Sequence, residues 1–177
     1  PARQTVAVID TVPGWPALAA RGLHKRFGEH VAVSSLDLDI PVGSFCGLVG
    51  PNGSGKTTTL RMAAGLLRPD VGQVWIGGHD TWQETTTVRT LLGVVPDPLH
   101  LFDRLSAREL LTHLGRLRGL SREQVAERSE QLLAVMDLID SADDRIGGYS
   151  HGMRKKTAIS AALLHRPAVL LLDEPFE

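Results

Sequence analysis

The chain has 177 residues and a formal net charge of −1, and 42% of its residues are hydrophobic while 22% are charged. These values are typical of a soluble globular domain that buries one hydrophobic core. The balanced charge argues against a large nucleic-acid-binding surface, and no apolar run approaches the roughly 20 residues of a membrane-spanning helix. Cys46 is the single cysteine, and a chain without disulfides fits a reducing compartment such as the cytoplasm.

The first part of the chain predicts strands after a short arm. Residues 1–17 contain Pro13, Gly14 and Pro16 and are expected to form a loosely held arm. Strands are expected from Ala17 onward. Polar and apolar residues alternate over residues 35–40, which predicts a strand with one solvated face. The apolar run of residues 45–49 predicts a buried strand, with Cys46 as a packed rather than a reactive thiol.

Residues 50–57, Gly-Pro-Asn-Gly-Ser-Gly-Lys-Thr, fit the phosphate-binding loop G-x-x-x-x-G-K-[ST]. Apolar residues at helical spacing follow, which predicts a helix over residues 57–67. Glycines allow the backbone to curl around a phosphate, and the helix adds the positive end of its dipole. Lys56 then supplies a charge to the β- and γ-phosphates and Thr57 a hydroxyl to Mg²⁺. The alternative is a glycine-rich turn that binds nothing.

The middle of the chain predicts a short strand and then helices. Residues 74–76 form an apolar segment between glycines, as expected of a strand. Ser106 with Glu109, and Ser121 with Gln124, fit capping boxes that open two helices. Each helix has an apolar face, formed in the first by Leu110, Leu111, Leu114 and Leu117 and in the second by Val125, Leu132, Leu133 and Met136. The arginines between them are expected on solvated faces.

A second chemical motif lies near the end of the chain. Residues 168–172 are a continuous apolar run, typical of a central parallel strand covered on both sides, and Asp173 and Glu174 follow it directly. A carboxylate at such a strand end can hold Mg²⁺, and a second one can orient a water molecule against the γ-phosphate. Taken alone, the pair is also what an ordinary strand end looks like.

The third motif completes a resemblance to a known family. Residues 148–153, Gly-Tyr-Ser-His-Gly-Met, precede a helical stretch that runs to His165. The order of phosphate loop, helices, Ser-x-Gly helix start and apolar strand ending in Asp-Glu-Pro resembles an ABC-type ATPase, the nucleotide-binding subunit of ABC transporters. The Tyr-Ser-x-Gly-Met form is similar to the signature of exporter ATPases of the drug and antibiotic resistance type. Without a ligand, Ser150 would simply cap a helix.

The resemblance covers residues 18–177 and implies an α/β fold. The fold consists of a P-loop NTPase core, an N-terminal antiparallel β region and a helical subdomain at about residues 97–155. The implied cofactors are ATP and Mg²⁺, with Lys56 and Glu174 as catalytic residues. The metal ligands are Thr57, Asp173 and Asp97. The implied nucleotide contacts are Phe27, which stacks on adenine unless it is a core residue, and Val33, Gly50, Asn52, Gly53, Ser54, Gly55, Lys56, Thr57, Thr58, Ser150 and Gly152.

The resemblance also implies partners and a location. In the family, Ser150 and the amides after it meet the γ-phosphate held by a second subunit, so ATP joins two copies head to tail. An integral membrane permease subunit would carry the substrate, and the chain would lie peripherally on the cytoplasmic face of the membrane. The apolar residues Leu99, Leu101 and Phe102 predict the permease contact within residues 97–102. No nucleic acid partner is expected.

This sequence departs from the family pattern at three points. Asp97 stands where the family often has glutamine, and His151 replaces a signature glycine. A histidine at the dimer interface predicts pH-dependent dimerisation, whereas a surface histidine without a role predicts none. The chain stops at Glu177, before the family's downstream loop and γ-phosphate-sensing histidine, so an N-terminal fragment of a longer protein is expected.

Two other functions compete with transport. A soluble ABC-type ATPase of translation or DNA maintenance would share all three motifs. Against it, no long coiled-coil insertion lies between Lys56 and Ser150, and the 177 residues contain no second phosphate loop, although truncation could hide a second cassette. A nucleotide-binding fragment without turnover is the other alternative. The permease, not this chain, would determine the substrate.

Overall fold

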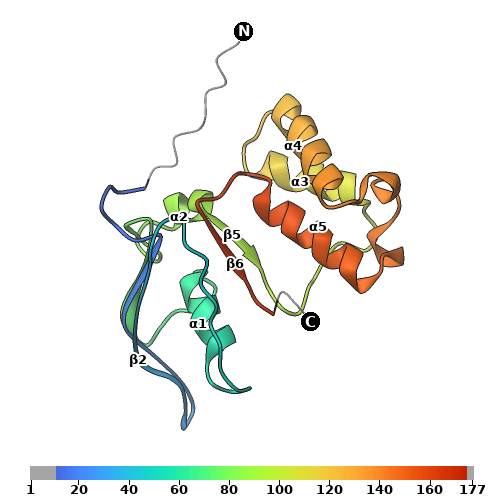
Figure 1. Cartoon of the computed structure of the whole chain (residues 1–177). Helices are drawn as coiled ribbons and strands as arrows, with labels where there is room; N and C mark the ends of the chain where they lie inside the picture. The colour runs from blue at the N-terminus through green and yellow to red at the C-terminus, as the bar shows by residue number, and fades with distance from the viewer. Residues whose placement is uncertain (1–10, 175–177) are drawn as a thin grey trace. The chain divides into compact units, whose positions relative to one another are not determined.

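The computed structural model describes residues 11–174 and divides into two units, Pro1–Leu92 and Gly93–Glu177. Figure 1 traces the elements of each unit in chain order. Residues 1–10 of the expected arm and Pro175 of the Asp-Glu-Pro motif lie outside the described residues.

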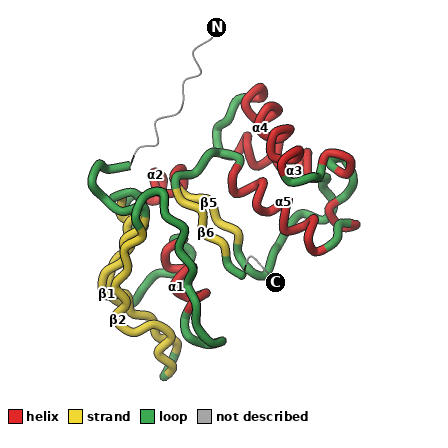
Figure 2. The backbone as a smooth tube through the Cα atoms, in the orientation of Figure 1, coloured by secondary structure: helices red, strands yellow, loops and turns green. Residues whose placement is uncertain are grey.

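An antiparallel sheet dominates the first unit. Its strand order is β2-β1-β3-β4, and its strands are β1 (Leu18–Phe27), β2 (His30–Ile40), β3 (Val71–Ile76) and β4 (His79–Asp80). Figure 2 shows β1 and β2 running together as a long twisted pair. This sheet confirms the expected N-terminal antiparallel region. The alternation predicted at the end of β2 is also confirmed, because Asp37 and Asp39 are exposed while the apolar residues between and after them are partly buried.

Two helices belong to the same unit, α1 (Lys56–Ala63) and α2 (Thr85–Leu91). The core that they share with the sheet includes Leu23, Val33, Met62, Val74, Ile76 and Leu91. α1 ends earlier than the predicted Leu67. Gly65 adopts a φ of +68°, its N–H donates to Met62, and the N–H of Leu66 donates to Arg61. This glycine-based C-cap terminates the helix.

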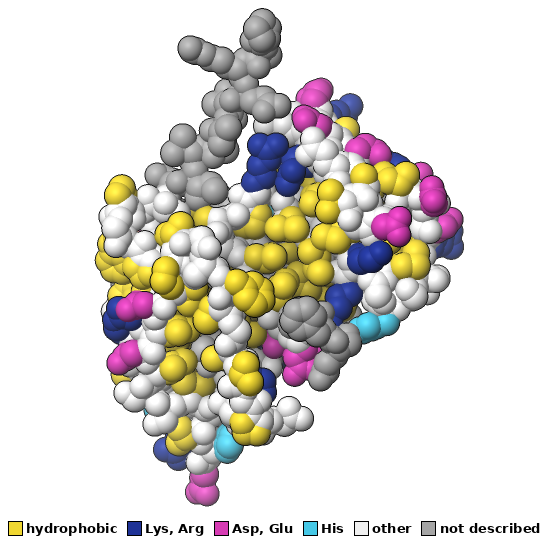
Figure 3. All heavy atoms as spheres, in the orientation of Figure 1, with side chains coloured by type: hydrophobic (Ala, Val, Ile, Leu, Met, Phe, Trp, Pro, Cys, Tyr) yellow, Lys and Arg dark blue, Asp and Glu magenta, His cyan; other side chains and the backbone are white. Residues whose placement is uncertain are grey.

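The segment before the phosphate loop differs from its prediction. Residues 45–49 form no regular secondary structure, and the side chains of Phe45 and Val49 are 91% and 93% exposed. Cys46 is exposed as well, so the predicted buried strand and packed thiol are both wrong for this structure. An apolar run forms a strand only where a neighbour supplies hydrogen bonds and cover, and neither described sheet includes residues 45–49. Figure 3 shows hydrophobic side chains reaching the surface of the face drawn.

Residues 11–17, part of the expected arm, contact the turn between β3 and β4. The N–H of Val12 donates to the carbonyl of Gly77 at 2.8 Å, and the N–H of Gly77 donates to Ala17 at 2.9 Å. The rings of Trp15 and Trp75 lie 5.9 Å apart. These contacts attach this part of the arm to the sheet.

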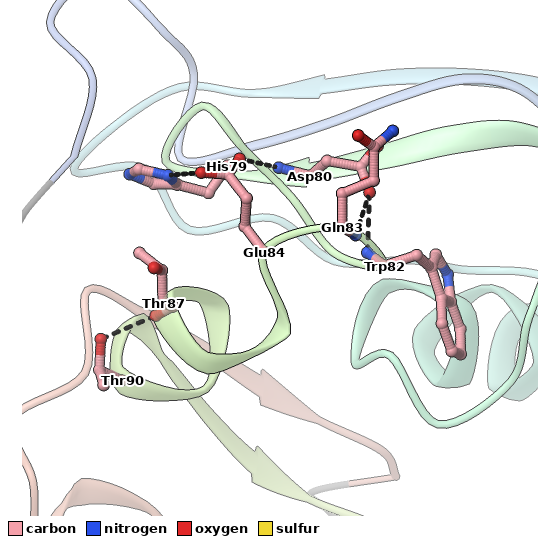
Figure 4. Close-up of polar contacts among 7 residues, drawn as sticks. All are labelled: His79, Asp80, Trp82, Gln83, Glu84, Thr87 and Thr90. Carbon is pink, nitrogen blue, oxygen red and sulfur yellow. Dashed lines mark hydrogen bonds and ion pairs between the residues drawn. The ribbon is translucent and has the colours of Figure 1, made fainter.

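The connection from β4 to α2 is organised by Asp80. One carboxylate oxygen of Asp80 accepts the N–H groups of Trp82 and Gln83 at 2.8 and 2.9 Å (Figure 4). Glu84 accepts the N–H of Asp80 at 3.0 Å and pairs with His79 at 2.9 Å. The hydrogen bond from His79, followed by that from Asp80, lowers the pKa of Glu84. These bonds compensate for the burial of the Asp80 carboxylate. The polar side chains of His79, Asp80 and Glu84 therefore stabilise the turn between β4 and α2.

The second unit contains three helices and a two-stranded sheet. In chain order its elements are β5 (Leu92–Val95), α3 (Ala107–Leu117), α4 (Arg122–Val135), the 3-10 turns η1 (Ile139–Ser141) and η2 (Ile146–Gly148), α5 (His151–Leu163) and β6 (Val169–Leu172). Strands β5 and β6 pair and run in the same direction (Figure 1). Both predicted capping boxes are confirmed, at Ser106 and at Ser121.

Two apolar clusters hold this unit together. One lies among α3, α4 and α5 and includes Leu110, Leu111, Leu133, Ile146, Tyr149 and Leu164. The other joins α5 to the sheet through Val95, Ala158 and Ala162, with Leu170 and Leu172 packed against them. Strand β6 has β5 as its one partner among the described residues, and its side chains are mostly half-buried, so the predicted full cover on both faces is wrong here.

No helix within residues 11–174 is both long and apolar enough to cross a membrane.

Candidate functional site

The phosphate loop leads directly into α1. Gly55 stands at the N-cap of this helix with a φ of +89°, a left-handed conformation that favours glycine. The N–H of Ser54 donates to Pro51 at 3.2 Å and closes the turn before the helix. A helix N-terminus presents backbone N–H groups that lack intrahelical partners, and this one has no side-chain cap. The local structure therefore has the form that an anion-binding loop requires.

Lys56 folds back over this loop. Its Nζ lies 2.8 Å from the carbonyl oxygen of Gly50 and 3.0 Å from that of Pro51. A Cβ on Gly50 would lie 2.7 Å from the Oγ of Ser54, so the loop is tight at its base. The ammonium is thus held within reach of any phosphate that the loop encloses. Asn52 and Gly53 at the tip are exposed, and Thr57 and Thr58 in the first turn of α1 are half-buried.

The two residues predicted to meet the base lie on the sheet. Val33 is buried, and one of its methyl groups would lie 3.1 Å from a Cβ placed on Gly55. Val33 therefore packs against the phosphate loop itself. Phe27, at the end of β1, is 50% exposed, which distinguishes it from a core residue. Lys25 lies 5.6 Å from the centre of its ring and forms an ion pair with Asp70 at 2.7 Å.

The predicted carboxylates belong to the second unit. Asp173 directly follows β6, is buried, and donates its N–H to the carbonyl of Val95 at 3.0 Å. Asp97 is exposed and lies two residues after β5. Because paired parallel strands end at the same edge of their sheet, Asp97 and Asp173 share that edge. The described residues contain no group of three His, Cys, Asp or Glu that could hold a metal. Carboxylate oxygens are the donor type that a hard cation such as Mg²⁺ takes, usually with water and phosphate oxygens beside them.

Ser150 caps the N-terminus of α5. Its Oγ accepts the N–H of Met153 at 3.2 Å. Ser150, His151 and Gly152 are all exposed, whereas Tyr149 is buried and donates its hydroxyl to the carbonyl of Ser141. Burial raises the pKa of the Tyr149 hydroxyl. The buried tyrosine anchors this end of the helix, while residues 150–152 in its first turn are exposed.

Arg154 connects the start of α5 to the segment that follows β5. Its Nη1 lies 2.7 Å from a carboxylate oxygen of Asp103 and 3.1 Å from the carbonyl oxygen of Ile146. The N–H of Gly147 donates to the carbonyl of Asp103 at 3.0 Å. Two of these hydrogen bonds therefore hold Asp103 to the segment around the start of α5. Nothing in the sequence pattern marks this pair.

The apolar side chains of residues 97–102, the predicted permease contact, are only partly exposed at the surface. Of the three apolar residues predicted there, Phe102 is 59% exposed. Leu99 and Leu101 instead pack against the clusters below α5 and α3. Leu99 and Leu101 are partly buried because they pack against the core of their own unit, so the predicted contact surface is exposed mainly at Phe102.

Sequence reasoning also missed one residue near the carboxylates. Lys155, on α5, donates a hydrogen bond to the backbone carbonyl of Glu174. Glu174 has a φ of +48°. Neither the backbone acceptor nor the left-handed conformation has a sequence signal. The phosphate-loop group thus lies in the first unit, and the Asp173, Glu174 and Ser150 groups lie in the second.

Comparison with known proteins agrees with the motifs. The model of the ABC transporter family matches residues 33–177. The daunorubicin resistance ATP-binding protein DrrA3 of Streptomyces coeruleorubidus is 38% identical over 159 residues, which cover 90% of this chain and 50% of that protein. The ABC transporter ATP-binding protein NatA of Bacillus subtilis is 42% identical over 145 residues, or 81% of this chain and 59% of that protein.

A solved structure of an ATP-binding subunit of an ABC transporter superposes with a TM-score of 0.82 at 27% identity, covering 90% of this chain and 67% of that one. The chain spans about half of the length of the first of these relatives. The matched family model extends over most of the chain and includes all three motifs. The chain therefore belongs to the ABC transporter family.

Proposed function

We propose that this chain is the ATP-binding and ATP-hydrolysing part of an ABC transporter subunit, which energises export through a separate membrane subunit. The observation that carries the proposal is the loop of residues 50–57, which leads into α1 with Lys56 held over its carbonyls. The names of similar proteins support the direction of transport, since they include daunorubicin resistance and Nod factor export ATP-binding proteins.

Binding of ATP would use the first unit. The glycines and Ser54 of the loop would enclose the phosphates, and the backbone N–H groups at the start of α1 would bind them. Lys56 leaves the carbonyls of Gly50 and Pro51 and pairs with the β- and γ-phosphates. Phe27 supplies an exposed aromatic ring for the adenine, and Val33 supports the loop from below.

Hydrolysis would use the carboxylates of the second unit. Thr57 and Asp173 would hold Mg²⁺, with Asp97 as a further oxygen donor at the same sheet edge. When bound, the cation neutralises charge on the β- and γ-phosphate oxygens. Glu174 would orient and polarise the attacking water molecule. Ser150 and Gly152 would bind the γ-phosphate of a second copy through the open first turn of α5, which makes ATP part of a head-to-tail homodimer.

The test is a Glu174→Gln substitution in the full-length protein with its membrane partner. We expect ATP binding to persist and turnover to fall by at least about a hundredfold, as for loss of a general base, so that an ATP-bound dimer accumulates. Size-exclusion chromatography with ATP measures the dimer, and phosphate release measures turnover. Undiminished turnover would rule out the mechanism.

A second measurement separates transport from its alternatives. A peripheral transporter subunit on the cytoplasmic membrane face should co-purify with a hydrophobic permease in detergent. A soluble ATPase of translation or DNA maintenance should not, and a module without turnover should bind ATP but release no phosphate.

A further inference from the structure

The contact between Lys155 and Glu174 joins the two functional segments of the second unit. Lys155 lies on α5, five residues after the cap at Ser150, and is half-buried. Its Nζ donates a hydrogen bond to the backbone carbonyl of Glu174, 19 residues later in the chain. An α-helix rises 1.5 Å per residue, so Lys155 lies about 7.5 Å along the helix axis from the Ser150 turn.

Glu174 has a backbone conformation that needs support. Its φ of +48° lies in the left-handed region, which is sterically unfavourable for an L-residue with a side chain. Such conformations persist where the surroundings impose them, and they are common at functional sites. The residue before it, Asp173, is fixed to β5 by the hydrogen bond to Val95. Lys155 holds Glu174 itself, through a hydrogen bond to the Glu174 backbone carbonyl.

We propose that Lys155 is a positioning residue for Glu174. By holding the carbonyl, the ammonium fixes the Glu174 backbone and therefore the direction in which the carboxylate leaves the strand. The inference rests on the proposed function, in which that carboxylate orients the attacking water molecule. In this arrangement α5 has two roles. Its first turn offers Ser150 to the phosphate bound by a partner copy, and its Lys155 sets the geometry of the Glu174 carboxylate in its own chain.

A merely structural lysine at a strand end would behave differently. It would contribute to the free energy of unfolding, and its loss would not act through Glu174. A positioning lysine affects the chemical step, because an error of about 1 Å in a catalytic group can cost on the order of a hundredfold in rate. It leaves nucleotide affinity unchanged, since Lys155 is not among the proposed nucleotide contacts.

The experiment uses the full-length protein with its membrane subunit and measures kcat, KM, the Kd for a fluorescent ATP analogue, and Tm. The variants are Lys155→Met and Lys155→Gln, which remove the charge, and Lys155→Arg, which keeps a donor. Lys156→Met is the matched control, because the described residues offer no ion pair or hydrogen bond to its ammonium. Each Lys155 variant is also made together with Glu174→Gln.

We expect Lys155→Met and Lys155→Gln to lower kcat at least about tenfold with Kd within about twofold, and Lys155→Arg to restore much of the rate. In the Glu174→Gln background the same changes should alter the residual rate less than about twofold, because residues that act as a unit are not additive. The control should retain the wild-type kcat.

Three outcomes would overturn the proposal. A kcat within about twofold of wild type in both uncharged variants would show that Glu174 needs no support from Lys155. An equal loss in the presence and absence of Glu174→Gln would show that Lys155 acts elsewhere. A fall in Tm alone would identify a structural lysine. If instead Glu174→Gln by itself leaves turnover unchanged, the proposed function fails and this inference fails with it, so the two failures are distinguishable.

Discussion

A Cβ atom placed on Gly55 would lie 2.3 Å from the carbonyl oxygen of Ala32. Strand β2 therefore passes so close to the phosphate loop that glycine alone fits at the start of α1. The loop motif and the sheet are thus coupled through one backbone contact, and the φ of +89° at Gly55 reinforces the requirement.

The first prediction follows from this contact. Gly55→Ala should destabilise the protein by more than the roughly 1–2 kcal/mol of a left-handed alanine, because β2 must also move, and nucleotide binding should be lost. Gly119→Ala is the control, since Gly119 has a φ of +79° with nothing within 4 Å of its added Cβ. Chemical unfolding of both variants measures the difference. Equal destabilisation would mean that the contact with Ala32 does not constrain the loop.

The second prediction concerns Lys56. Lys56→Met should lower ATP affinity at least about tenfold, because a charge-assisted bond to phosphate is lost from the site. It should lower the free energy of unfolding only slightly, since the two hydrogen bonds to loop carbonyls are partly exposed. Titration with a fluorescent ATP analogue measures affinity, and Lys156→Met serves again as the control. Unchanged affinity would contradict the assignment of the loop.

The third prediction compares the two capping boxes of the helical region. Ser106 is buried, while Ser121 is exposed. Ser106→Ala should cost about 1–2 kcal/mol, because the N–H of Glu109 loses its acceptor away from water. Ser121→Ala should cost about 0.5 kcal/mol, because water can replace its hydroxyl. Urea unfolding measures both losses, and a larger loss for Ser121→Ala than for Ser106→Ala would contradict the prediction.

The fourth prediction concerns stability in acid. The hydrogen bond from Lys25, then that from the N–H of Arg26, holds the pKa of Asp70 below its ordinary value of 3.8. A carboxyl with a depressed folded-state pKa contributes stability that is present above 3.8 and is lost as the pH falls through the lower, folded-state value. Asp70→Asn should therefore be less stable than wild type near neutral pH, and the two should converge below about pH 4.

Urea unfolding at several pH values measures this convergence. Asp140→Asn is the control, because Asp140 is an exposed carboxylate without a side-chain hydrogen bond or ion pair among the described residues. It should follow the wild-type curve at every pH. A constant difference between Asp70→Asn and wild type across the range would mean that Asp70 contributes no pH-dependent stability.

Local patterns predicted the local structure well. The capping boxes at Ser106 and Ser121 and the alternation around Asp37 and Asp39 each depend on residues within one turn or one strand, so a short window of sequence contains the cause. The predicted strand over residues 45–49 depends instead on which neighbour pairs with it. Its composition could not supply that information, and the structure leaves Phe45 and Val49 exposed.

The sequence by itself determined the family and its three motifs, because phosphate binding needs particular residue types at fixed spacing along the chain. Only the tertiary structure decided how those residues are held. The approach of Ala32 to Gly55, the ion pair of Arg154 with Asp103, and the bond from Lys155 to the Glu174 backbone join segments distant in sequence. Two of these three contacts use a backbone carbonyl, which every residue has, so side-chain identity gives no signal of them until the chain is folded.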